Sequence, residues 1–62
     1  MVINFSKSFI INGEIKWLRI NAKVERTEMR WTRRGNRLHY IVRLEDGRIC
    51  TINSEHATVV EA

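Results

Sequence analysis

The chain has 62 residues, of which 44% are hydrophobic and 29% charged, with no proline and a net charge of +4. Residues 1–62 make one small domain, close to the lower size limit for burying a core without a disulfide, a metal or a partner, so an enclosed active site is not expected. The hydrophobic content argues against a disordered chain, and no apolar run reaches the 18 or so residues of a membrane-spanning helix.

The N-terminal segment alternates apolar and polar residues with a period of two. Its apolar residues are Ile3, Phe5, Phe9 and Ile11, and its polar ones are Asn4, Ser6 and Ser8. This period predicts a strand with one buried face. The Asn12-Gly13 pair that follows predicts a tight hairpin, because both residues tolerate the positive φ of a type I′ turn.

The segment from Glu14 to Thr32 is ambiguous by composition. As a helix it would carry apolar residues on two opposite sides, and a chain this short can hardly bury both. As a strand, its apolar residues from Leu18 to Val24 share one face, but those at Met29 and Trp31 have the opposite parity. One extra residue, a β-bulge within residues 25–28, would restore them to the inner face. The sequence therefore predicts a long bent strand that can serve two sheets.

The rest of the chain contains two further turn signals, Gly35-Asn36 and Asp46-Gly47. Alternating residues between them predict a third strand, and "RICTI" predicts a fourth. The stretch "NSEHA" offers a Ser/Asn cap and one helical or 3₁₀ turn, and "TVVE" predicts a short last strand. Together these segments predict five strands in a meander, with a single short turn before the fifth.

This order of elements resembles the SH3-like small barrels, a group that includes Tudor, KOW, retroviral-integrase C-terminal and Sm-type modules. The resemblance lies in residues 37–61, where "YIVRLEDGRICTINSEHATVV" has the pattern of their last three strands. It implies an all-β, five-stranded antiparallel SH3-like barrel. It carries over no binding residue, since the chain has neither a Tudor aromatic cage nor a KOW glycine signature.

Charge is distributed unevenly along the chain. Residues 16–37 contain eight basic residues against two glutamates, whereas one arginine faces four carboxylates from Leu44 to the end. Such asymmetry favours an anionic partner for the middle segment.

The stretch "RWTRRGNRLHY" interleaves arginines with aromatic residues around a hairpin turn. Guanidinium groups bind phosphates through paired hydrogen bonds, and aromatic rings stack on unpaired bases. We therefore predict binding of DNA or RNA, mainly through phosphate contacts and with low sequence specificity. The alternative is that these charges only keep a sheet edge soluble. The candidate nucleic-acid-binding residues are Arg30, Arg33, Arg34, Arg37, Lys23, Arg26, Trp17 and Trp31.

A second hypothesis concerns apolar residues that point outward. The parity of the strands predicts an inner set of Ile3, Phe5, Phe9, Ile11, Leu18, Ile20, Ala22, Val24, Met29, Leu38, Tyr40, Val42, Leu44, Cys50, Ile52 and Val59. It predicts an outward set of Ile10, Trp17, Ile41, Ile49 and Val60. The first four of the outward set are the candidate interface residues, because merged exposed apolar side chains mark interfaces. In this hypothesis the chain is a protein-interaction module, or a small regulator of phage or plasmid type, that docks on an acidic partner, and a homo-dimer is compatible with either function.

The candidate metal ligands and nucleophiles are Cys50, His39 and His56. Their separations match no zinc signature, and no catalytic site is predicted from them. A core thiol is the simpler interpretation of Cys50. A single cysteine, with no basic and apolar leader before it, predicts a cytoplasmic location. The prediction is a binding module and not an enzyme, with no cofactor, no metal and no membrane partner.

Overall fold

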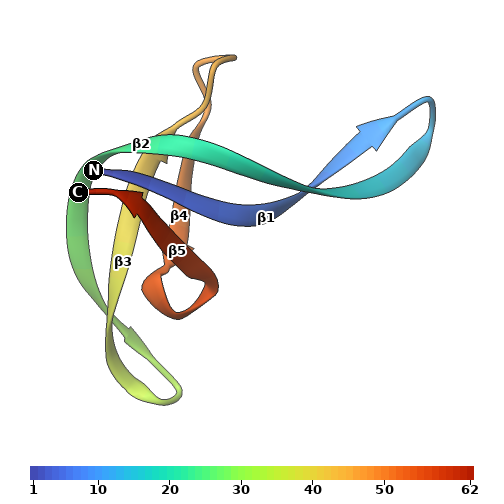
Figure 1. The fold of residues 1–62 in the computed structure, drawn as a ribbon. Coiled ribbons are helices and arrows are strands. Elements are labelled where there is room, and N and C mark those ends of the chain that lie inside the picture. Colours follow the sequence, from blue (N-terminus) through green and yellow to red (C-terminus); the bar gives the residue numbers. More distant parts are fainter.

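A computed structural model describes residues 1–62 as an all-β chain of five strands (Figure 1). The elements are β1 (Val2–Ile11), β2 (Glu14–Thr32), β3 (Gly35–Arg43), β4 (Ile49–Asn53), the 3₁₀ turn η1 (Ser54–His56) and β5 (Ala57–Glu61). All neighbouring strands pair antiparallel in the order β4-β3-β2-β1-β5. The predicted five antiparallel strands and the 3₁₀ turn before the last strand are confirmed. The sheet curls without closing, and β5 pairs with β1 instead of continuing the meander.

The long second strand bends at a β-bulge. β2 pairs with β1 from Glu14 to Lys23, and its second half pairs with β3. The register shifts between Val24 and Arg26, so that Glu25 is the extra residue. A bulge bends its strand and strengthens the local twist. The predicted bulge within residues 25–28 is therefore confirmed, and it lets one strand serve two halves of the sheet.

The first two hairpins close differently. Asn12 and Gly13 have φ of 54° and 78°, as the predicted type I′ turn requires. In the second hairpin the tip is formed by Arg33 and Arg34, and Gly35 begins β3 with φ of +97°. The predicted Gly35-Asn36 centre is thus wrong.

The side chain of Thr32 explains the shifted turn. Its Oγ1 donates to the carbonyl of Gly35 at 2.8 Å and accepts the backbone N–H of Arg34 at 3.1 Å. These two bonds close the turn over the two arginines. They place the positive φ on glycine, the residue that tolerates it without steric cost.

Replacing Gly35 with alanine is expected to destabilise the domain by about 1–2 kcal/mol, because a Cβ is strained in the left-handed region. Urea denaturation followed by circular dichroism measures the change. The Asn36→Ala variant is the control, since Asn36 is exposed and has negative φ. Equal urea midpoints for the two variants would contradict a positive φ at Gly35.

The core is small. Its buried cluster comprises Ile3, Phe5, Ala22, Tyr40 and Val42, and the partly buried residues packed against it are Ile20, Val24, Leu44, Cys50, Ile52 and Ala57. Most of the predicted inner set is therefore confirmed. Five members of that set are instead exposed: Ile11, Leu18, Met29, Leu38 and Val59. The first four lie toward the ends of hairpins and the fifth on an edge strand, where one face of the sheet has no layer opposite it.

The predicted outward set is correct except at one position. Ile10, Ile49 and Val60 are exposed, whereas Ile41 is 1% exposed. Ile41 lies in β3 between Arg26 and Thr51, and η1 also packs against β3, with Glu55 paired to Arg37 on the same face as Ile41. Ile41 is therefore removed from the candidate interface.

Two hairpins extend away from the core (Figure 1). The accessible surface is 4792 Å², against about 4,200 Å² expected for a compact chain of this mass. The radius of gyration is 12.4 Å, against about 10.6 Å for a compact domain of this length. Surface that a compact domain would bury is thus left open on the hairpins. No helix in the structure has the length and apolar character needed to span a membrane.

Candidate nucleic-acid interface

A groove crosses the outer face of three strands, and we call it the Trp17–Arg19 groove. Trp17 and Arg19 of β2 line one side, Ser6 of β1 lies between, and Glu55 and His56 of η1 line the other side; Thr58 of β5 also contributes. Its volume is about 490 Å³, within the range of ligand pockets, about 300–1,000 Å³. The groove is open and mainly polar, with one large aromatic ring at its rim.

The strand register explains why this ring and this guanidinium are uncovered. Trp17 lies opposite Ser8, and Arg19 lies opposite Ser6. Both partners are small, and alternate residues of a strand share a face, so the two β2 side chains stand side by side above a floor of serines. Trp17 remains 71% exposed. This confirms its predicted outward position.

Arg19 is held in place by neutral groups. Its Nε donates to Oδ1 of Asn4 at 2.7 Å and its Nη1 donates to Oγ of Ser6 at 3.3 Å. Asn4 is oriented in turn, because its Nδ2 donates to Oδ1 of Asn21 at 2.8 Å. None of these partners carries a negative charge. The guanidinium is therefore oriented but not neutralised, and it has N–H groups left for a ligand.

The 3₁₀ turn connects the groove to the second hairpin. The side chain of Asn53 caps η1 by accepting the Glu55 N–H at 3.0 Å. The Glu55 carboxylate then accepts Nε of Arg37 at 2.9 Å and lies 3.8 Å from Nη1 of Arg34. One acidic side chain thus lies between the groove and the arginines at the hairpin tip.

The arginines of β2 share a second carboxylate. Glu28 lies between Arg26 and Arg30, with ion pairs of 3.1 Å and 3.0 Å. The hydrogen bond from Arg30, then that from Arg26, holds the pKa of Glu28 below its usual 4.5. The carboxylate therefore stays charged at neutral pH, and its ion pairs are lost only as the pH falls through that lowered value. These two arginines are partly neutralised on the surface.

Six of the eight arginines in the chain form ion pairs: Arg26, Arg30, Arg34, Arg37, Arg43 and Arg48. The two that form none are Arg19 and Arg33. Arg33 lies at the hairpin tip, and Lys23, also without an ion pair, lies on β2 on the same face as Arg19. The six cations of the candidate nucleic-acid-binding set are therefore not equivalent. At four of them, a bound anion would compete with a glutamate that already forms an ion pair.

Trp31 lies apart from the other candidates. It is opposite Asn36 in the hairpin and 80% exposed, and it shares the face of Met29 and Leu38. Arg30 and Arg37, which are opposite each other, occupy the other face. The structure therefore separates the two tryptophans that the sequence placed in one candidate set.

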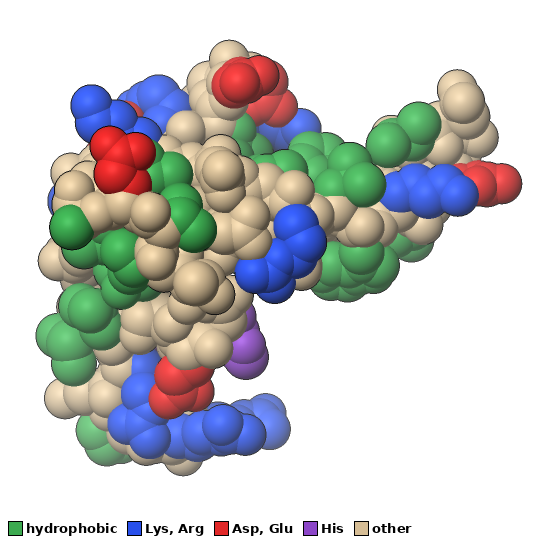
Figure 2. Space-filling model, viewed as in Figure 1, with side chains coloured by type: hydrophobic (Ala, Val, Ile, Leu, Met, Phe, Trp, Pro, Cys, Tyr) green, Lys and Arg blue, Asp and Glu red, His purple; other side chains and the backbone are tan.

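Figure 2 shows how charge is arranged around the hollow between the two hairpins. Lys and Arg side chains gather at the end of the lower hairpin, and more are present on the body above it. Hydrophobic side chains cover much of the upper hairpin. The hollow is thus bordered by a cationic end below and an apolar arm above.

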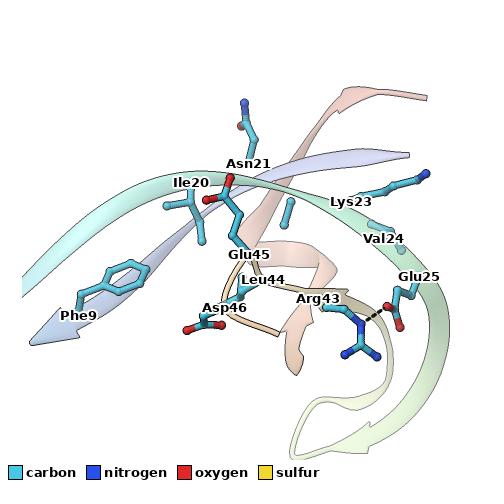
Figure 3. A pocket seen from close by; sticks show the side chains of 11 residues that line it. Phe9, Ile20, Asn21, Lys23, Val24, Glu25, Arg43, Leu44, Glu45 and Asp46 are labelled. Atoms are coloured by element: carbon cyan, nitrogen blue, oxygen red, sulfur yellow. Dashed lines mark hydrogen bonds and ion pairs between the residues drawn. The ribbon is translucent and has the colours of Figure 1, made fainter. Parts of the chain in front are cut away.

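A second, larger cavity lies on the inner side of the sheet (Figure 3). Phe9, Ile20 and Leu44 give it an apolar lining, and Glu45 and Asp46 stand at its rim. Hydrogen bonds from the backbone and the side chain of Arg48 hold the pKa of Asp46 below its usual value. The lining also contains Lys23, Arg43 and Glu25, so its three carboxylates exceed its two cations and do not favour an anionic ligand. Its aromatic ring, Phe9, already has the Lys7 ammonium 5.5 Å from its centre, whereas the Trp17 ring on the outer face is exposed.

Sequence reasoning missed Arg19, Ser6 and His56 as members of a site. Their separation along the chain hides the groove, because β5 reaches β1 only through the fold. The parity of Trp17 and Arg19 was the available signal, since it puts an aromatic ring and a cation on one face. No family model, no curated protein and no solved structure matches the chain.

Proposed function

We propose that this domain binds nucleic acid through the outer face that joins the Trp17–Arg19 groove to the Arg33-Arg34 tip. One observation carries the proposal: an oriented arginine without a carboxylate partner lies beside an exposed tryptophan. Phosphates bind guanidinium forks, and bases stack on indole rings. Contacts of this kind read backbone and stacking more than sequence, so low sequence specificity follows.

Other features of the chain support the fold type and the cellular compartment that belong to this proposal. The strand order, with a bent β2 and η1 before β5, supports an SH3-like architecture with one side left open. Small β-folds of this kind bind ligands on a curved sheet face. A single cysteine supports a cytoplasmic location. Nothing in this assignment requires catalysis.

Fluorescence anisotropy of labelled DNA and RNA at several salt concentrations tests the proposal. The logarithm of the association constant is expected to fall linearly with the logarithm of the salt concentration, with a slope that corresponds to several phosphate contacts. The denatured protein, which has the same net charge, is the control for non-specific attraction. If the folded domain binds nothing at low salt, the proposal is wrong.

Replacing Glu28 with glutamine is expected to tighten nucleic-acid binding several-fold, because it releases Arg26 and Arg30 from their shared carboxylate. The same anisotropy titration measures this gain. The Glu14→Gln variant is the control, because it removes an equal charge at the tip of the other hairpin, where Glu14 pairs with Lys16. An equal gain in both variants would mean that net charge, and not these arginines, determines the affinity.

A second candidate function is protein association through the first hairpin. Its outer face carries Ile10 opposite Ile15, which are 79% and 70% exposed, with Trp17 next along β2. Ile11 and Leu18 are exposed on its other face. An arm that is apolar on both faces is typical of an interface.

The Ile15→Glu variant is expected to reduce any dimer at least tenfold in association constant, because it places a charge within that apolar surface. Sedimentation equilibrium measures the association. Thr51→Glu is the control, since it adds the same charge at an exposed position of β4. A wild-type chain that is monomeric at millimolar concentration would rule out self-association and leave only a different protein as partner.

A further inference from the structure

We infer that the Trp17–Arg19 groove is a nucleotide subsite for single-stranded nucleic acid, in which one unpaired base stacks on Trp17 and the adjoining phosphate binds Arg19. This inference rests on the proposed function and adds the class of substrate and the two residues that select it. It predicts preference for an unpaired strand, which phosphate contacts at the hairpin tip would not supply.

The indole ring is available to a base. Trp17 is 71% exposed, and its neighbour across the strands is Ser8, so no large side chain opposes it on β1. Stacking needs the flat face of a base, which base pairs in a duplex cover on both sides. A base at this position must therefore be unstacked from its neighbours, as in a single strand.

The guanidinium is preorganised for a phosphate. Arg19 uses its Nε and one N–H of Nη1 to bond Asn4 and Ser6. These two bonds fix the plane of the guanidinium without neutralising its charge. The distal N–H groups stay free for a bidentate contact. Trp17 and Arg19 are two residues apart on one strand face, so their Cα atoms are roughly 6–7 Å apart, and a base and a phosphate of one strand can contact the two side chains together.

The wall of the groove opposite β2 favours one path for the backbone of the bound nucleic acid. His56 and Thr58 present groups that can hydrogen bond to a base or a sugar, and the Glu55 carboxylate repels phosphate. The backbone is thus expected to follow the β2 side of the groove, on the side of Arg19 and Lys23. Glu55 lies between this side and the Arg33-Arg34 tip, so we expect the two cationic regions to contact different phosphates.

The test uses the full chain with Trp31→Phe, which leaves Trp17 as its one tryptophan. The probes are oligodeoxyuridylate and oligouridylate of about 12 nucleotides, which differ only in the 2′-hydroxyl and have a length in the range of small-barrel sites, and a duplex of equal length. Both single strands are expected to quench Trp17 fluorescence, and the duplex is not. The comparison of the two single strands tells whether a 2′-hydroxyl matters.

Two substitutions identify the contacts. Trp17→Ala is expected to lower the affinity for the single strands about 5- to 150-fold, and Arg19→Gln about 5-fold at 0.1 M salt through one lost phosphate contact. Arg48→Gln is the control of equal charge, on a turn away from the groove. Thermal melting confirms that each variant is folded, and Trp17→Phe, which keeps a ring, is expected to retain most of the affinity.

The outcomes separate the two proposals. If the domain binds single strands and duplex equally, with Trp17 unquenched and Trp17→Ala without effect, the subsite is wrong while binding through the hairpin tip stands. If the wild-type chain binds no probe at low salt, both proposals are wrong. Quenching with loss of affinity in both groove variants supports the subsite.

Discussion

Replacing Phe5 with alanine is expected to leave the domain largely unfolded at room temperature. Phe5 is 1% exposed and is the largest of the fully buried side chains. Phe→Ala changes in cores cost about 3–5 kcal/mol. A domain of this size rarely has more than about 3–5 kcal/mol of stability from its core. One substitution therefore removes about as much free energy as the fold has.

Circular dichroism and urea denaturation measure the loss. Ile10→Ala is the matched control, because it also shortens an apolar side chain of β1, but one that is 79% exposed. Its cost is expected to stay within about 0.5 kcal/mol. A Phe5→Ala domain with the urea midpoint of the wild type would show that the cluster around Phe5 is not what holds the two halves of the sheet together.

Replacing Arg33 and Arg34 together with alanine is expected to weaken nucleic-acid binding roughly 25- to 60-fold at 0.1 M salt. Each phosphate contact contributes about 0.7 to the log–log salt slope for a single strand and about 0.9 for a duplex, so two lost contacts lower the slope by about 1.4–1.8. The free energy of unfolding is expected to change by less than about 0.5 kcal/mol. Arg33 forms no ion pair, and the Arg34–Glu55 distance is a long 3.8 Å.

The control is a double variant of Arg43 and Arg48, which removes the same charge at the other end of β3. Both are exposed and ion-paired, with Glu25 and Asp46. If this variant weakens binding as much as the hairpin variant, the attraction is due to net charge and not to a located surface. If the hairpin variant unfolds, its arginines have a structural role instead.

Two glutamates of the candidate interface compete with phosphates for its arginines. Glu28 and Glu55 each hold two arginines. A phosphate has to displace a carboxylate at these positions, whereas it meets none at Arg19 and Arg33. The ion pairs are exposed and weak, so the phosphates of a nucleic acid are expected to displace these carboxylates from the arginines. For the proposed function we therefore expect a nucleic-acid affinity lower than the count of arginines suggests, and we expect removal of a glutamate to raise it.

Local patterns in the amino-acid sequence were enough to predict the strands, the type I′ turn at Asn12-Gly13 and the bulge in β2. These features depend on local preferences: a period of two, residues that tolerate positive φ, and a change of parity that only one extra residue can correct. The candidate cations at the second hairpin follow from composition in the same way. The centre of that turn did not, because two hydrogen bonds of Thr32 decide it.

Which side chains are buried, and which residues form the groove, depend on the assembled fold. Parity assigns Leu18 and Met29 to the inner face, but only the curl of the sheet leaves that face uncovered at the ends of the hairpins. The assembled fold likewise buries Ile41 of β3. The groove exists because β5 returns to β1 and brings η1 opposite Trp17 and Arg19. Contacts between residues so far apart in the chain depend on how strands assemble, and no local pattern of one sequence contains that information.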